Sequence, residues 1–358
     1  MNEFGTRYRV GVFGTSHGPC VGAKVEGCPA GSKISEAFIQ TELDRRSPGK
    51  GPLTTARRER DRLEIISGIR NGKATGGPIV GMIRNVDTDS TAYDAFLRVP
   101  RPGHADYPAM VKYGGHHDHR GGGQFSGRMT AALVIGGAIA RQVLERSKIS
   151  FLAQTVQIGK VAVKKDLPFS IAEKLVRSSP VGCADRKISE LMTDEIVKAH
   201  EEKDSVGGVV RCTIIGLPVG VGEPFFASVE SRMAEMMFSV PGVKGVEFGS
   251  GFRCASMRGS EHNDEFVLKN GRIVTKTNNA GGILGGLSNG MPIEFRVAFK
   301  PTSSIAKTQM SVDVVDKKPV QLEIRGRHDP CIVPRAVPVV ENASAAVILD
   351  LMLEGGFI

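Results

Sequence analysis

The chain has 358 residues, and its 47 Lys and Arg against 38 Asp and Glu give a formal net charge of +9. This length excludes a peptide module or a disulfide-stabilised mini-protein, and it suffices for one large domain or two ordinary ones. Hydrophobic residues make up 41% and charged residues 24% of the sequence, proportions that are typical of globular proteins and not of long disordered segments or coiled coils.

Strand and helix signals alternate along the chain. In chain order the predicted elements are a strand at 8–13, a helix at 36–46, a strand at 78–83, a helix from 126, a strand at 154–163, a helix from 185, strands at 209–215 and 292–299, and a helix at 338–353. Ser35 and Asp185 are the expected N-caps of their helices, and Gly355 and Gly356 end the last one. The Ala- and Gly-rich helix from Ser126 should let neighbouring backbones approach closely. This pattern predicts an α+β protein.

A faint internal repeat predicts two related halves. Residues 25–31 resemble residues 214–220, and a helix that ends at Pro-Gly follows each segment. Two more similarities follow in the same order, at 77–79 with 291–293 and at Arg120 with Arg327. We therefore expect a single domain, 1–358, with pseudo-equivalent lobes at about 7–150 and 206–358 and an insert at about 151–205. Chance similarity between Pro and Gly turns is the alternative.

No segment predicts membrane insertion or secretion. The longest uncharged apolar stretch with helical character, residues 129–140, is shorter than the roughly twenty residues that span a bilayer. The N-terminus reaches Glu3, Arg7 and Arg9 without an apolar region, so no signal peptide is expected. The six cysteines have no Cys-x-x-Cys spacing, which indicates reduced thiols and no structural metal. We expect a cytoplasmic protein that does not contact membranes.

Positive charge is concentrated between residues 45 and 62. Seven Lys and Arg in this run face only two acidic residues, a local charge of +5. Nucleic-acid binding is a common interpretation of such a run, but nucleic-acid-binding segments usually interleave aromatic residues, and this one has none. The arginines fit a small, highly anionic substrate better, because guanidinium groups make forked contacts with phosphate and carboxylate.

Five loop motifs carry side chains that are useful for catalysis or binding, at 14–18, 101–106, 120–126, 300–304 and 325–331. The first two present His17 and His104, although an isolated loop histidine is more often exposed and inert. The triple-glycine motif is either a site for an anion or cofactor at a helix start, or a flexible connector. The Lys-Pro-Thr-Ser-Ser motif is a phosphate cradle or a capped turn. The last motif could equally be a structural ion-pair cluster.

In combination these motifs resemble the chorismate synthase family along nearly the whole chain. Further segments in the family's order lie at 44–46, 54–59, 241–245 and 279–286. The resemblance implies a lyase that removes phosphate from 5-enolpyruvylshikimate 3-phosphate by anti-1,4-elimination to give chorismate, the last step of the shikimate pathway leading to aromatic amino acids. It also implies a flavoprotein that needs reduced FMN without consuming it, the family's β-α-β sandwich, and a homotetramer.

The same resemblance implies roles for individual residues. Catalytic residues would be His17 near flavin N1 or the substrate, His104 at the departing phosphate, and Asp329 as a base near flavin N5. Substrate would contact Ser16, Arg45, Arg46, Arg57, Arg128 and Arg327. FMN would contact Gln124, Phe125, Ser126, Gly286, Lys300, Pro301, Thr302, Ser303, Ser304 and Arg327.

Some positions depart from the family pattern. Thr15 stands where many members have Glu, Gln124 and Phe125 where many have Arg and Ser, and Ser47 and Pro52 where many have Arg. The departures at Ser47 and Pro52 remove cations that would bind the 2′-phosphate of NADPH, although Arg46 remains a possible NADPH contact. No Gly-x-Gly-x-x-Gly opens a βαβ unit, so a separate Rossmann site is not expected. We expect an external flavin reductant, with NADPH a cofactor only if the enzyme is bifunctional.

Two other classes remain as alternatives. Residues 115–119, with three histidines and an aspartate, could belong to a metal-dependent hydrolase, but such close neighbours rarely converge on one ion without a distant ligand. The sequence pI of about 9.3 could indicate a nucleic-acid-binding protein.

Overall fold

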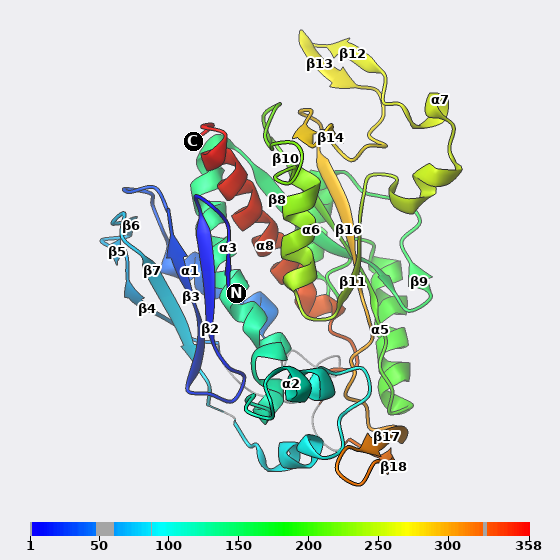
Figure 1. Ribbon diagram of the computed structural model, residues 1–358. Coiled ribbons are helices and arrows are strands. Elements are labelled where there is room, and N and C mark those ends of the chain that lie inside the picture. Colours follow the sequence, from blue (N-terminus) through cyan, green and yellow to red (C-terminus); the bar gives the residue numbers. More distant parts are fainter. Residues whose placement is uncertain (1, 48–60, 87, 325–327) are drawn as a thin grey trace.

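Two five-stranded sheets enclose a layer of helices (Figure 1). The computed structural model describes residues 2–47, 61–86, 88–324 and 328–358. The first sheet has the order β1 (Glu3–Phe4), β2 (Arg9–Gly14), β3 (Cys20–Glu26), β7 (Ile79–Arg84) and β4 (Leu63–Ser67). The second has the order β11 (Val243–Phe248), β16 (Ile293–Phe299), β10 (Gly208–Ile215), β8 (Ser150–Ile158) and β9 (Val161–Ala162). The described pairings in both sheets are antiparallel.

Four helices form the middle layer: α1 (Glu36–Arg46), α3 (Thr130–Leu144), α6 (Val229–Ser239) and α8 (Val333–Glu354). α3 packs on β3, α8 packs on β8 and β10, and the two helices pack against each other. The remaining elements are β5 (Ile69–Arg70), β6 (Lys73–Ala74), η1 (Thr91–Leu97), α2 (Asp106–Lys112), η2 (Arg120–Phe125), η3 (Gly127–Met129), η4 (Glu145–Ser147), α4 (Phe169–Ser178), α5 (Arg186–Glu201), η5 (Gly251–Ser256), α7 (Gly259–His262), β12 (Phe266–Lys269), β13 (Arg272–Thr275), β14 (Ile283–Leu284), β15 (Leu287–Ser288), β17 (Gln309–Asp313) and β18 (Lys318–Leu322).

Both lobes use one order of elements. Chain order β2, β3, α1, β4, β7, α3 in the first lobe corresponds to β8, β10, α6, β11, β16, α8 in the second. The equivalent strands also lie side by side in the same order, β2-β3-β7-β4 and β8-β10-β16-β11. The predicted α+β sandwich of two pseudo-equivalent lobes is therefore the architecture observed.

The structure moves one boundary of the predicted insert. Residues 150–158 form β8, which pairs with β10 along its length, so the start of the segment expected as an insert at 151–205 is instead a strand of the second sheet. The strand expected at 154–163 is divided at Gly159, whose φ of 53° turns the chain before β9. The repeat was visible only at Pro and Gly turns, and no such turn marks where β8 begins.

Local capping signals agree with the structure. The Ser35 hydroxyl accepts a hydrogen bond from the Phe38 N–H at 3.2 Å, and the Asp185 carboxylate accepts one from Ile188 at 3.1 Å. The last helix starts at Val333, earlier than the expected 338, so Pro338 lies inside it. An internal proline removes one backbone hydrogen bond, and here the helix continues through it because almost every side chain beyond it is buried.

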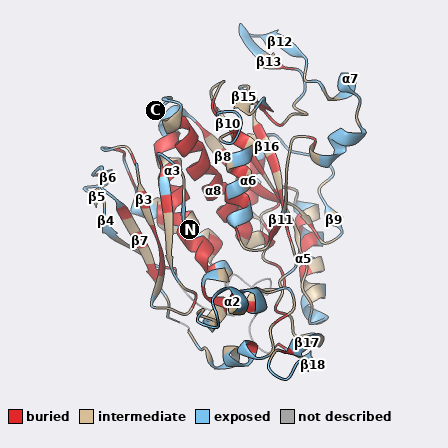
Figure 2. Cartoon of the chain, viewed as in Figure 1, coloured by how far each residue is buried: buried red, intermediate tan, exposed pale blue. Residues whose placement is uncertain are grey.

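The core lies along α3 and α8 (Figure 2). A Cβ atom built on Gly137 of α3 would lie 2.0 Å from the backbone oxygen of Asn342 in α8, so glycine is what permits this close crossing. The predicted close approach of backbones at the small-residue helix is thus confirmed. Of the residues that the structure describes, those of α8 alone form a helix long and apolar enough for a membrane span, and 94% of its apolar window is buried in the molecule. All six cysteines are free thiols.

We predict that Gly137→Ala destabilises the fold strongly. The added methyl group would overlap the α8 backbone, which cannot move aside as a side-chain tip could, and overpacking of this kind costs about 2–3 kcal/mol. Chemical denaturation measures the change in unfolding free energy. Gly259→Ala is the matched control, because a Cβ there would meet only Asn263 at 3.9 Å. Equal stability of the two variants would show that α3 and α8 are not held this closely.

Candidate active site

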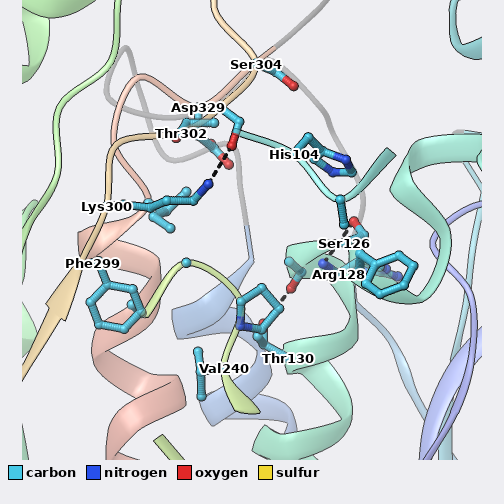
Figure 3. Close-up of a pocket in the computed structure, with 18 of the residues that line it drawn as sticks. His104, Ser126, Arg128, Thr130, Val240, Phe299, Lys300, Thr302, Ser304 and Asp329 are labelled. Carbon is cyan, nitrogen blue, oxygen red and sulfur yellow. Dashed lines mark hydrogen bonds between the residues drawn. The ribbon is translucent and has the colours of Figure 1, made fainter. Parts of the chain in front are cut away.

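A cavity of about 560 Å³ lies at one end of the helical layer, within the usual size range of small-molecule sites. α3 and α8 begin at the cavity, while α1 and α6 end at it, so both lobes contribute to its wall. The N-termini of α3 and α8 favour bound anions, because the helix dipoles place partial positive charge at this end of both helices. Figure 3 shows His104, Arg128, Lys300 and Asp329 around this space.

The structure brings most of the predicted site residues to this cavity. Those that line it are Arg46, His104, Gln124, Phe125, Ser126, Arg128, Lys300, Pro301, Thr302, Ser303, Ser304 and Asp329. They come from segments that are up to about 280 positions apart in the chain (Arg46 to Asp329 is 329 − 46). Arg57 and Arg327, the remaining predicted arginines of the loops, lie outside the described residues.

Arg45, which we expected to contact the substrate, is not among the residues that line the cavity. Its guanidinium donates to Glu42 at 2.6 Å and to Glu341 of α8 at 3.1 Å. Arg141 of α3 joins the same buried cluster, 3.0 Å from Glu42 and 2.9 Å from Glu341. Consecutive helical residues point about 100° apart, so α1 can aim Arg46 at the cavity only by aiming Arg45 elsewhere.

Three other predicted residues also lie away from the lining. Gly286 is in the turn between β14 and β15, where its carbonyl accepts a hydrogen bond from Val229 at 3.0 Å. Ser16 is buried, and its N–H donates to Gly123 at 3.3 Å. His17 lies behind the triple-glycine loop: a Cβ on Gly121 would be 2.2 Å from the His17 ring. Because Gly121 has no side chain, the His17 ring packs directly against the backbone of this residue, which itself lines the cavity.

Arg46 and Arg128 share a carboxylate that the sequence analysis missed. Arg46 is 2% exposed and lies 2.8 Å from Asp61, and its Nε donates to Thr130 at 3.0 Å. Arg128 also pairs with Asp61. Burial, together with the nearby guanidinium of Arg335, lowers the pKa of Arg46 to about 9. Burial alone would raise the pKa of Asp61, but the two arginines outweigh it and lower that pKa.

A second buried network holds His104. Its Nδ1 lies 2.5 Å from Asp106, and Arg101 contacts the same carboxylate at 2.7 and 2.8 Å. Arg101 also donates to Ser304 at 3.2 Å and stacks over Phe96 at 4.5 Å. Burial opposes ionisation of Asp106, yet its hydrogen bonds to Arg101 and His104 hold its pKa well below the ordinary value. Arg101 also lines the cavity, but the sequence analysis assigned it no role. The available signal was its place at the start of the 101–106 motif, directly before Pro102.

Lys300 and Ser303 form a polar corner beside Gly103. The Lys300 ammonium donates to the Ser303 hydroxyl at 2.9 Å and to the Gly103 carbonyl, and Ser303 donates to the same carbonyl at 2.7 Å. Burial and Lys244 lower the pKa of Lys300. The buried Thr302 hydroxyl has no hydrogen-bond partner among the described residues. This corner can offer an ammonium and hydroxyl groups to a phosphate.

Arg335 was also missed by the sequence analysis. It lies in the first turns of α8, pairs with Asp329, and donates through Nε to the Arg46 backbone at 3.1 Å. Cations therefore come from both lobes, and a histidine able to transfer a proton stands among them. Such an arrangement can bind a compound with several negative charges and assist the departure of phosphate.

The histidine-rich segment at 115–119 has other partners. Asp118 accepts hydrogen bonds from Arg120 and Thr15, and His119 lies 2.8 Å from Asp94. Within the described ranges, no three His, Cys, Asp or Glu side chains gather closely enough to hold a metal ion.

Comparisons with known proteins point to one family. A family model described as chorismate synthase matches residues 8–353. The chorismate synthases of Methanococcoides burtonii and Methanothermobacter thermautotrophicus are 46% and 47% identical, over 100% of this chain and 97% and 95% of theirs. That of Korarchaeum cryptofilum is 48% identical, over 97% of this chain and 96% of its own. A solved crystal structure of a chorismate synthase has a TM-score of 0.77 and 29% identity, over 98% of this chain and 93% of that chain.

We predict that Asp106→Asn destabilises the protein in a pH-dependent manner. The pKa of Asp106 is lower in the folded protein than in the unfolded chain, where it is about 4. The ionised carboxylate therefore stabilises the fold above about pH 4, and this stabilisation is lost as the pH falls toward the lower folded pKa. The variant should lose about 2–3 kcal/mol of unfolding free energy at pH 7, and the difference should shrink below about pH 4. Denaturant titrations from pH 7 to 2 measure it. Asp94→Asn, on an exposed carboxylate, should change little, and a constant difference for Asp106→Asn would contradict the prediction.

Proposed function

The chain belongs to the chorismate synthase family, and on this premise we propose that the cavity at the start of α3 and α8 is its active site. The protein is a lyase that converts 5-enolpyruvylshikimate 3-phosphate to chorismate and phosphate, the last step of the shikimate pathway toward aromatic amino acids. One observation carries the choice of site: Arg46, Arg128, Arg335 and Lys300 surround a single cavity together with His104.

The residues of the cavity fit reduced FMN. The Thr302 hydroxyl, which has no hydrogen-bond partner in the part of the chain that the structure describes, and the Lys300–Ser303 corner suit a phosphate. Phe125 offers a flat apolar surface beside the triple-glycine loop. We assign FMN to the lining residues Gln124, Phe125, Ser126, Lys300, Pro301, Thr302, Ser303 and Ser304. When bound, reduced flavin supplies electron density for cleavage of the allylic C–O bond. Gly286 is left out of this assignment, because its carbonyl is bonded to α6.

The chain's own residues then bind the anionic groups and move protons. Arg46 and Arg128 would hold the substrate phosphate and carboxylates as forked donors. His104, fixed by Asp106, would give a proton to the departing phosphate. Asp329, held by Arg335, is the candidate base. His17 packs against the backbone of Gly121 and is not among the lining residues, so we assign it no direct contact with the substrate.

The setting of the enzyme is also part of the proposal. Family membership supports a cytoplasmic homotetramer that receives reduced flavin from an external reductant. The basic residues that the structure describes near the end of α1 face buried carboxylates and the cavity, which supports a small anionic substrate over a nucleic acid as the partner.

The direct test is an anaerobic assay of the purified protein with 5-enolpyruvylshikimate 3-phosphate and chemically reduced FMN. We expect chorismate absorbance and free phosphate to appear in equal amounts, because each elimination releases one of each. Protein without reduced flavin is the control. Folded protein that releases no phosphate under these conditions would refute the proposed reaction.

We predict that His104→Ala lowers turnover by about 10²- to 10³-fold, the usual effect of losing a proton-transfer group. The fold should persist, since His104 lies on a loop before α2. Steady-state rates with saturating reduced FMN measure the effect. His117→Ala is the control, because His117 is outside the cavity lining, and unchanged turnover in His104→Ala would remove His104 from the mechanism.

We predict that the enzyme cannot reduce its own flavin with NADPH. Ser47 and Pro52 depart from the family pattern, in which arginine is common at both positions. Fewer cations are therefore available to bind the 2′-phosphate of NADPH. Anaerobic incubation with NADPH, catalytic FMN and substrate, without dithionite or a reductase, should give no sustained chorismate formation. Adding dithionite to the same sample is the positive control. Steady product formation before that addition would show a bifunctional enzyme.

A further inference from the structure

Asp61 is a buried carboxylate that stands behind the cavity wall. It is 0% exposed and lies two positions before β4, and it is not one of the residues that line the cavity. Its partners, Arg46 and Arg128, both do line it. A role for Asp61 must therefore act through these arginines and not through contact with a ligand.

The two arginines reach Asp61 from different elements and on different oxygens. Arg46, the last residue of α1, places Nη1 2.8 Å from Oδ2. Arg128, from η3 just before α3, pairs with Oδ1. Two guanidinium groups at one wall repel each other. A carboxylate between them offsets that repulsion, and each of its oxygens holds one of the two guanidinium groups.

The remaining donors of the arginines extend this arrangement to the His17 loop. Arg128 Nε donates to Asn85 Oδ1 at 3.1 Å. The amide of Asn85 in turn donates to the carbonyls of Thr15 at 3.0 Å and Gly18 at 2.8 Å, on either side of His17. One carboxylate is thus connected to the phosphate-binding candidates and to a predicted catalytic loop.

Gln40 fixes the backbone that carries Asp61. Its Nε2 donates to the Asp61 carbonyl at 2.8 Å, and its Oε1 accepts from the Leu63 N–H at 2.9 Å. Gln40 belongs to the same helix as Arg46. The position of Asp61 relative to α1 is therefore held by main-chain contacts that do not depend on its own side chain.

We propose that Asp61 is a positioning residue: it holds Arg46 and Arg128 side by side, in the one geometry in which both can bind the same anionic substrate. The proposal deepens the proposed function and rests on it for the identity of that substrate. Two other roles predict different results. If Asp61 only stabilised the fold, its replacement would leave substrate binding unchanged. If Asp61 only reduced the positive charge of the wall, its replacement by a neutral residue would strengthen the binding of an anionic substrate.

The test compares Asp61→Asn and Asp61→Glu with Glu42→Gln. Glu42, on α1, is a matched control because its side chain is as buried as that of Asp61. It pairs with Arg45 and Arg141, and neither of these arginines lines the cavity. For each full-length variant, the melting temperature is measured, and kcat and KM for 5-enolpyruvylshikimate 3-phosphate are measured anaerobically with reduced FMN.

We expect both Asp61 variants to raise KM by about tenfold or more, since displacements near 1 Å at a binding group have effects of this order. Glu42→Gln should lower the melting temperature and leave KM unchanged. If Asp61→Asn behaves like Glu42→Gln, Asp61 is only structural. If Asp61→Asn lowers KM while Asp61→Glu resembles the wild type, Asp61 acts only through charge. Either result overturns the proposal.

A ligand-free measurement separates this proposal from the proposed function. In the wild type, the Nε–H groups of Arg46 and Arg128 are bonded to Thr130 and Asn85, so their NMR signals should exchange slowly with water. Asp61→Asn should speed that exchange even if the wild type turns over no substrate, and unchanged exchange would overturn the positioning role. If Asp61→Asn does not fold, a second variant, Gln40→Met, removes the contacts of Gln40 with the backbone at Asp61 and Leu63, together with its exposed contact with Asp44. It should raise KM about threefold or more, and an unchanged KM would count against the proposal.

Discussion

The close crossing of α3 and α8 is the constraint on which the rest of the structure depends. Gly137 lets α3 lie against the backbone of α8 at Asn342, so one thin helical layer fits between two sheets. The equivalent helices of the two lobes meet in this way, and both begin at the same end of the molecule, where the cavity lies. The cavity forms there, and two helix N-termini contribute to it.

Burial of positive charge is the second requirement of this site. The arginines of the cavity wall have little access to water, where an uncompensated charge is strongly unfavourable. Each is accordingly given a carboxylate partner: Asp61 for Arg46 and Arg128, Asp106 for Arg101, and Asp329 for Arg335. The partners also fix the directions of the guanidinium groups, so charge compensation and orientation are achieved by the same contacts.

The duplicated architecture explains why the site is shared between the lobes. Arg128 stands just before α3, and Arg335 stands in the first turns of the equivalent helix α8. Arg46 ends α1, while Ser239 and Val240 stand at the end of the equivalent helix α6. The two lobes thus present equivalent ends of their helices to one cavity, but with different side chains, which gives the cavity its chemically distinct sides.

The sequence by itself determined the features that depend on neighbours along the chain. Ser35 and Asp185 cap their helices because a cap bonds to an N–H three residues away, and the loop motifs that carry His104 and Lys300 were visible as Gly- and Pro-rich segments. The motifs in their order also sufficed to identify the family. Features of this kind can be predicted because the relevant partners are close in sequence.

Only the tertiary structure decided which of these side chains meet. Arg45 and Arg46 are indistinguishable in sequence, yet the helical turn sends one to Glu341 and the other to the cavity. Asp61, Arg101 and Arg335 acquired their places in the site from contacts with distant segments, which are Arg128, Ser304 and the backbone of Arg46 respectively. The assignment of β8 to the second sheet likewise rests on its pairing with β10. The physical reason is common to all these cases: the direction of a side chain and the identity of its partner depend on how distant elements pack, and local sequence does not encode that packing in any readable pattern.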